Sequence, residues 1–194
     1  MEQSGAVSPE TRTRLLDMAK EVASYPEERP HDGFARITIT EAIEGGLEGN
    51  AAIGALIVEP TGQVILQDHN RMFFPRFRSD FHAEMVLLTR YENDLGNQAD
   101  LRGHTLVTSL EPCEMCMIRI INSGVTHTLF IASDVGKGGI TGPNTLAPHW
   151  ARLAEPQDFA VADCSPRLAE IGLEVFHTTI GGVVEKMMAR RLPG

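Results

Sequence analysis

The sequence predicts an α/β domain in which one sheet of about five strands carries helices on both faces. Two observations support this prediction. Short apolar runs typical of buried strands alternate along the chain with segments whose apolar residues recur at helical spacing. The chain also has 194 residues, of which 42% are hydrophobic and 22% charged, and this is enough for one domain with a sizeable core.

The first 30 residues are predicted to form a helical extension followed by a linker. Ser8-Pro9-Glu10 places a capping serine before a proline at the first helical position. Apolar residues then follow helical spacing to about Tyr25, and residues 26–32 are charged and contain proline, which is typical of a linker. We therefore expect the main domain to span residues 31–194.

The elements of the main domain are delimited by apolar runs and by the glycines and prolines at their ends. Residues 33–46 are ambiguous, because Arg36–Thr40 alternates like a strand within a segment that also fits a helix. The expected strands are 51–58, 63–67, 106–108, 126–132 and 173–178, and the further expected helices are 83–91, 112–124, 165–169 and 183–191.

Two short segments in the middle of the chain carry the residues of a metal site. His82-Ala83-Glu84 and Pro112-Cys113-Glu114-Met115-Cys116 together supply one imidazole, two thiols and a carboxylate. Imidazole nitrogen and thiolate sulfur are donors that zinc prefers, and three protein donors leave a fourth tetrahedral position for water. The pattern therefore predicts a catalytic Zn2+ site with His82, Cys113 and Cys116 as ligands.

The spacing within each segment supports that prediction. Pro112 fits the first position of a helix, so Cys113 and Cys116 are expected one turn apart on the same helical face. Two thiolates balance the charge of Zn2+, which leaves Glu84 free to move protons as the catalytic residue. A redox-active thiol pair is the alternative, but that hypothesis gives no role to His82 or Glu84.

At these residues the chain resembles the cytidine deaminase-like superfamily, and within it the branch of nucleobase and tRNA-adenosine deaminases. That branch carries the pattern T-S-x-E-P-C-x-M-C, which reads T-S-L-E-P-C-E-M-C from Thr108 to Cys116. The resemblance extends over residues 53–131. It implies a three-layer α/β/α sandwich with a central mixed sheet, a helix over residues 33–46, and a homodimer.

The resemblance also implies a function for residues 31–194 as a zinc-dependent deaminase domain, a hydrolase acting on the C–N bond of a cyclic amidine. Zinc lowers the pKa of a water molecule, and Glu84 moves protons from that water to the ring and to the leaving ammonia. In the family, an asparagine and a backbone group at the positions of Asn70 and Ala83 hold the substrate ring.

Two loops are candidates for further substrate contacts. Met72–Arg78 interleaves basic and aromatic residues, which suits base stacking and phosphate binding, although such a run more often fills a core or forms a dimer interface. Residues 133–156 are rich in glycine and proline and are expected to form a long loop over the site. Trp150 in this loop is either a substrate contact or an anchor for the loop.

Charge bears on the identity of the substrate. The net charge of −9 would repel a polyanion, so we expect a small aminated heterocycle of the cytosine or guanine type rather than a nucleic acid. One alternative is adenosine in a tRNA, for which the Met72–Arg78 loop argues. Another is a catalytically silent, zinc-stabilised interaction domain, and the presence of Glu84 argues against it.

Cysteine content and hydropathy bear on location. Three cysteines, two of them in the metal motif, make no disulfide framework, and Cys164 is expected to be a small, partly buried side chain or a free thiol. The N-terminal residues lack the basic and apolar regions of a signal peptide, and no apolar run is long enough to span a membrane. These features predict a cytoplasmic protein that does not bind membranes.

Overall fold

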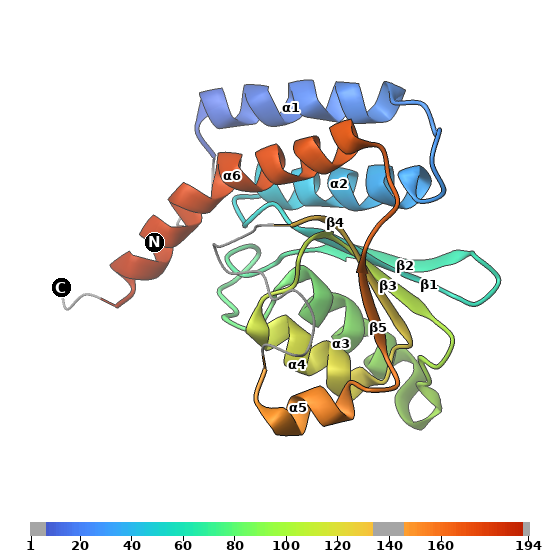
Figure 1. Cartoon of the computed structure of the whole chain (residues 1–194). Coiled ribbons are helices and arrows are strands. Elements are labelled where there is room, and N and C mark those ends of the chain that lie inside the picture. Colours follow the sequence, from blue (N-terminus) through green and yellow to red (C-terminus); the bar gives the residue numbers. More distant parts are fainter. Residues whose placement is uncertain (1–6, 134–145, 192–194) are drawn as a thin grey trace.

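A mixed five-stranded sheet runs through the centre of the protein (Figure 1). The computed structural model describes residues 7–133 and 146–191. The strand order is β2-β1-β3-β4-β5, in which β1 is antiparallel to β2 and β3, whereas β3, β4 and β5 run parallel. The predicted mixed α/β sheet is therefore confirmed. Its strands are β1 (Gly54–Val58), β2 (Val64–His69), β3 (Thr105–Leu110), β4 (His127–Ala132) and β5 (Asp158–Val161).

Helices cover both faces of the sheet, which confirms the predicted three-layer arrangement. Helices α2 and α6 lie against one face, and α3 and α4 lie together on the other (Figure 1). Helix α5 packs on α4, and α1 forms an additional outer layer over α2 and α6. The helices are α1 (Pro9–Ser24), α2 (Asp32–Leu47), α3 (Ala83–Leu95), α4 (Glu114–Ser123), α5 (Pro148–Leu153) and α6 (Pro166–Ala189), and a 3-10 turn spans Gly96–Gln98.

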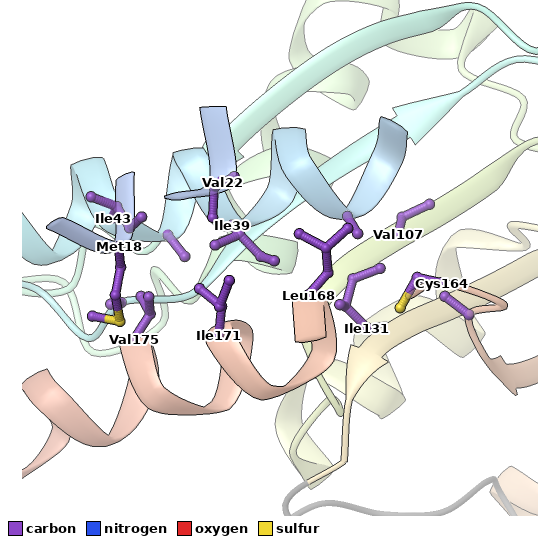
Figure 2. Close-up of a cluster of buried hydrophobic side chains, with 14 of the residues drawn as sticks. Met18, Val22, Ile39, Ile43, Val107, Ile131, Cys164, Leu168, Ile171 and Val175 are labelled. Atoms are coloured by element: carbon purple, nitrogen blue, oxygen red, sulfur yellow. The ribbon is translucent and has the colours of Figure 1, made fainter. Parts of the chain in front are cut away.

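The outer helix α1 shares the hydrophobic core of the domain. Its buried Met18 and Val22 pack in one cluster with Ile39 of α2 and Ile171 of α6 (Figure 2). Cys164 is buried in the same cluster, as the sequence predicted for a small apolar side chain. Because apolar area removed from water stabilises a fold, α1 helps to hold α6 in place. The domain boundary near residue 30 stays a prediction.

The C-terminal third of the chain differs from the prediction. Residues 165–191 were expected to form two short helices around a strand at 173–178, but that strand is wrong, because one helix of 24 residues, α6, covers the segment. The alternation of apolar residues over 173–178 is too short to distinguish a strand from a helix. Over a longer window the buried residues recur every three or four positions, at Leu168, Ile171, Val175, Thr179 and Val183.

The fifth strand instead lies at Asp158–Val161, where it pairs in parallel with β4. This edge strand is mostly exposed and therefore lacks the apolar run that marks a buried strand. The expected long loop over 133–156 is interrupted by α5, and residues 134–145, with the Gly136–Gly139 segment, lie outside the described residues. Within the described part of the chain, no helix combines the length and apolarity needed to cross a membrane.

A buried aspartate joins the linker after α1 to the start of α6. Asp32 is fully buried, and its Oδ2 accepts hydrogen bonds from the Glu28 and Arg29 N–H groups, both at 2.9 Å. The Ser165 N–H and hydroxyl also donate to this carboxylate, at 2.6 and 2.7 Å. Burial raises the pKa of Asp32, but these hydrogen bonds outweigh it and lower the pKa to about 2.

Replacing this carboxylate should destabilise the fold. In Asp32→Ala the buried N–H groups lose their acceptor, so the free energy of unfolding at pH 7 should fall by about 2–3 kcal/mol. Because the pKa of Asp32 is lower in the folded state than in the unfolded state, its contribution is present above about pH 4 and lost as the pH falls through about 2. Urea unfolding at several pH values should show that the difference in unfolding free energy between Asp32→Ala and the parent shrinks over that range. Asp94→Ala, at an exposed position, should change stability by less than about 0.5 kcal/mol.

Candidate active site

The two halves of the metal motif meet where α3 and α4 begin. His82 is the N-cap of α3, and Cys113 is the N-cap of α4, directly after β3. The expectation that Pro112 opens the second helix is corrected by this arrangement. The backbone of Cys113 is extended, with φ −75° and ψ 170°, so the helix begins at Glu114 and Pro112 precedes the cap. Cys116 still falls in the first turn, one turn from Cys113.

The three predicted zinc ligands form one cluster. The Cys113 and Cys116 sulfur atoms each lie 3.6 Å from the His82 Nδ1 atom, and they are 3.7 Å from each other. Bonds of about 2.3 Å to sulfur and about 2.0 Å to nitrogen at tetrahedral angles place such donors roughly 3.5–3.8 Å apart. Both the donor set and its spacing therefore fit zinc, with these three residues as the candidate ligands.

Hydrogen bonding and burial shift the acidities within this cluster. The hydrogen bond with the Cys116 thiol, together with the nearby His82, lowers the pKa of Cys113 to about 4. The same thiol–thiol contact and burial raise the pKa of Cys116. Burial alone would lower the pKa of His82, but its contacts with Cys113 and Glu84 raise it. One thiol is thus already disposed to be a thiolate, the form that binds metals.

Glu84 lies beside the cluster, as the sequence predicted for a carboxylate that is not a ligand. Its side chain is almost fully buried, and burial raises the pKa of its carboxyl group. The Oε2 atom is 3.3 Å from the Cys116 sulfur. Glu84, His82 and Cys113 all line a cavity of about 220 Å³, which we call the catalytic cavity. A carboxylate facing such a cavity can exchange protons with whatever occupies it.

One wall of the catalytic cavity was missed by sequence reasoning. It is apolar and comes from α6, which contributes Phe176, Ile180, Val183 and Met187. These positions are spaced by four, three and four residues, so they share one face of a helix. That spacing was the available signal, and the incorrect strand at 173–178 hid it. An apolar wall suits the flat face of a heterocyclic ring.

Asn70 lines the catalytic cavity at the end of β2. Its side chain is 1% exposed, and its Oδ1 atom accepts a hydrogen bond from the Met72 N–H at 3.0 Å. The amide NH2 makes no hydrogen bond to any residue that the structure describes. An NH2 group that lines a cavity and has no acceptor among the described residues can donate to a ligand.

His69 and Asp68 anchor the strand end that carries Asn70. The His69 Nδ1 atom lies 2.9 Å from Glu41 and its Nε2 atom 3.1 Å from Glu48. Burial lowers the pKa of His69, but hydrogen bonds to the two glutamates outweigh burial and the pKa is raised. Asp68 is buried and pairs with Arg71 and Arg90. Such polar networks fix the position of the backbone next to the cavity.

Glu111 is a second buried carboxylate in the catalytic cavity. It is 5% exposed, and its Oε2 atom accepts a hydrogen bond from the Ser133 hydroxyl. Its Oε1 atom is buried and has no hydrogen-bond partner among the described residues. An unsatisfied buried acceptor on a residue that lines a cavity suits a ligand that donates an N–H or O–H. Glu111 stands inside the sequence motif, but its exposure to the cavity follows only from the fold.

The two other predicted substrate contacts, Ala83 and Trp150, stay predictions. Ala83 is fully buried at the first position of α3, between the lining residues His82 and Glu84, and its N–H belongs to the helix turn that lacks intrahelical acceptors. Trp150 lies in α5, where its ring packs edge-on against His149 at 5.1 Å. Neither residue is part of the cavity lining in the described portion of the chain.

A mixed sheet that brings two thiols and an imidazole together at two helix N-termini defines a zinc-binding α/β domain of the deaminase type. The chain belongs to the family described as the cytidine and deoxycytidylate deaminase zinc-binding region, whose model matches residues 28–132. The matched range contains every predicted zinc ligand and Glu84. Zinc is therefore the metal of this site.

Several proteins of similar sequence are named for action on tRNA. The tRNA-specific adenosine deaminase of Bacillus subtilis is 36% identical over 109 residues, which cover 56% of this chain and 65% of the relative. The enzyme of the same name from Aquifex aeolicus is 31% identical over 107 residues, covering 55% of this chain and 69% of the relative. A tRNA(Ile)-lysidine synthase of Deinococcus deserti is 33% identical over 115 residues, but the chain spans only 21% of its length.

Solved structures share the fold. A structure from work on tRNA:A34 deaminases, which edit A to I at the wobble position, superposes with a TM-score of 0.59 and 25% identity. The alignment covers 74% of this chain and 98% of that one. A guanine deaminase from Nitrosomonas europaea superposes with a TM-score of 0.58 and 21% identity, covering 89% and 94%. The predicted cytidine deaminase-like architecture is thereby confirmed.

Zinc binding should depend on the three clustered ligands. We expect purified protein to contain about one zinc per chain, and His82→Ala and Cys116→Ser to lose most of it, because each removes one of three protein donors. Metal analysis after gel filtration would measure this. Cys164→Ser is the matched control, since Cys164 is buried in the core away from the motif and its replacement should leave the zinc content unchanged. Full zinc retention in Cys116→Ser would contradict the assignment.

Proposed function

We propose that this protein is a zinc-dependent aminohydrolase that releases ammonia from an amino-substituted nucleobase, nucleoside or related small heterocycle of the cytosine or guanine type. The observation that carries the proposal is the placement of Glu84. Its buried carboxylate lies 3.3 Å from a zinc-ligand sulfur and lines the cavity beside the cluster, without belonging to the three ligands. A structural zinc site has no need of such a group.

The chemistry divides between the metal and the chain. Zinc, when bound by His82, Cys113 and Cys116, supplies a Lewis acid that lowers the pKa of water toward ~7. The Glu84 carboxylate accepts a proton from the attacking water and delivers it to the ring nitrogen next to the amino-bearing carbon. The water oxygen bonds to that carbon, and the same carboxylate then moves the proton of the new hydroxyl group to the amino group. The C–N bond breaks, ammonia leaves and the carbon keeps a carbonyl oxygen. One carboxylate acts first as base and then as acid.

Other residues of the cavity would orient the ring. Neither the Asn70 NH2 nor the Glu111 Oε1 atom has a hydrogen-bond partner among the described residues, so together they would complement a base edge that has both an acceptor and a donor. We propose that the Ala83 N–H holds a ring substituent and that Trp150 closes on the ring. The apolar α6 wall would pack against the face of the ring and exclude water from it.

A small substrate is supported by two features of the chain. The net charge is −9, whereas binding to a polyanion needs a basic surface. The α6 wall also gives the cavity an apolar side formed by Phe176 and Ile180. Adenosine in a tRNA is the second candidate. It is supported by the names of the similar proteins and by the Met72–Arg78 loop, which lies at the cavity and carries Met72 into its lining.

We also propose a homodimer in a reducing, cytoplasmic setting. Cys113, Cys116 and Cys164 form no disulfide, and a reducing compartment keeps cysteines available for zinc. The family resemblance implies the dimer. Phe74 is a large apolar side chain that stands 45% exposed, and an interface would remove it from water.

Removal of the Glu84 charge should abolish catalysis and preserve the site. Glu84→Gln keeps the shape of the side chain but cannot shuttle protons, so ammonia release should fall by at least about 10³-fold while zinc content stays the same. Glu114→Gln is a matched control, because Glu114 is an exposed glutamate in the first turn of the other ligand-bearing helix. Its activity should equal that of the parent. Substantial turnover by Glu84→Gln would refute the proposed mechanism.

The substrate class can be tested with a panel. Ammonia release should be measured for cytosine, guanine and adenine, for their nucleosides and nucleotides, and for an anticodon stem-loop RNA. We expect turnover of a small molecule, because the acidic chain and the apolar cavity wall both disfavour a polyanion. Activity on the RNA alone would instead establish the second candidate.

A further inference from the structure

A second groove opens directly beside the catalytic cavity. It has a volume of about 260 Å³, and we call it the arginine groove. Met72 and Met187 line both spaces, so the two are neighbours and a ligand seated in the cavity can extend into the groove. The groove is lined by Met72, Phe77, Ser79, Met187, Arg190 and Arg191.

The charge of the arginine groove is positive, and no described residue compensates it. Its lining holds two guanidinium groups and no carboxylate. Among the ion pairs formed by the described residues, none involves Arg190 or Arg191. By contrast, Arg71 and Arg78, which flank the adjoining loop, each pair with an aspartate. In a chain of net charge −9, two cations that face one groove without an acidic partner indicate an anionic ligand.

The groove is also preorganised. The Arg190 guanidinium lies 3.7 Å from the centroid of the Phe77 ring, a stacked position that leaves its in-plane N–H groups free to donate. The loop that carries Phe77 is fixed by Asn50, whose Oδ1 atom accepts hydrogen bonds from the Phe73 and Phe74 N–H groups at 2.8 and 3.0 Å. The Arg78 N–H donates to the Met72 carbonyl at 2.7 Å, which closes the loop.

We propose that the arginine groove binds the phosphate of a nucleoside monophosphate whose base occupies the catalytic cavity. The forked N–H groups of Arg190 and Arg191 match phosphate oxygens, and the exposed Ser79 hydroxyl adds a neutral donor. Met72 and Met187 would pack against the sugar between the two spaces. This inference rests on the deaminase function proposed above, and it narrows the substrate from bases in general to phosphorylated nucleosides.

The test is a binding comparison that needs no turnover. Zinc-loaded, full-length Glu84→Gln protein is titrated calorimetrically with GMP, CMP and AMP and with the three matching nucleosides. For the preferred base, the nucleotide should bind roughly ten- to a hundredfold more tightly than its nucleoside, as expected for charge-assisted hydrogen bonds to two arginines. Adding Arg190→Ala and Arg191→Ala should bring the affinity for the nucleotide close to that for the nucleoside. The Arg190→Lys and Arg191→Lys pair should keep part of the preference for the nucleotide.

A matched control separates local binding from overall charge. Arg12→Ala with Arg14→Ala makes the same change in net charge at two exposed positions on α1, outside the groove. This pair should leave the nucleotide-to-nucleoside ratio unchanged. Equal loss in both double variants, or equal affinity of nucleotide and nucleoside in the parent background, would overturn the proposal.

Two further outcomes distinguish this inference from the proposed function and from an RNA ligand. If the parent releases ammonia from free bases but nucleotides bind no more tightly than nucleosides, the groove proposal is wrong and the deaminase function stands. If nucleotide binding depends on the two arginines but the parent releases ammonia from no substrate, the deaminase function is wrong and the groove proposal stands. If the two arginines increase affinity only for an anticodon stem-loop RNA, the mononucleotide proposal is wrong and the groove binds an RNA backbone.

Discussion

The active site depends on the register in which β1 pairs with its two neighbours. Gly54 at the start of β1 lies opposite His69 at the end of β2, and the Gly54 N–H donates to the Ser109 hydroxyl at the end of β3, at 3.0 Å. The chain continues from these strand ends into Asn70 and Glu111, which therefore reach the same cavity. A shift of one residue in either pairing would turn alternate side chains to the opposite face. Asn70 and Glu111 would then separate from the cluster of His82, Cys113 and Cys116.

The clustering of the candidate zinc ligands with Glu84 could be predicted from the sequence because each half of the motif is local. His82 and Glu84 are two residues apart at one helix start, and Cys113 and Cys116 are three apart at another, so short-range geometry already specifies their directions. The apolar wall could not be predicted in the same way. Whether residues 173–178 form a strand or a helix depends on burial against α1 and α2, which are distant in sequence. The edge strand β5 carried too little apolar character to be recognised.

The net charge of the whole chain does not describe the local charge of the surface next to the catalytic cavity. The chain as a whole is acidic, yet Arg190 and Arg191 face one groove together with Phe77, more than a hundred residues earlier in sequence. Composition averages over the whole surface, whereas a ligand responds to the few groups within about one Debye length, roughly 8–10 Å. The basic and aromatic character of the Met72–Arg78 loop was visible in the sequence. Its proximity to Arg190 and Arg191, which follow α6, was not.

The two faces of α6 restrict how this chain can change its length. Leu168 and Ile171 bind the helix to the core, while Phe176 and Met187 line the catalytic cavity from the same rigid element. Each added or deleted residue rotates everything beyond it by about 100° about the helix axis. A single-residue insertion between Ile171 and Phe176 would therefore turn the wall away from the cavity while the core contacts of Leu168 and Ile171 stayed in place. Related sequences can vary in side-chain size along this helix far more easily than in its residue count.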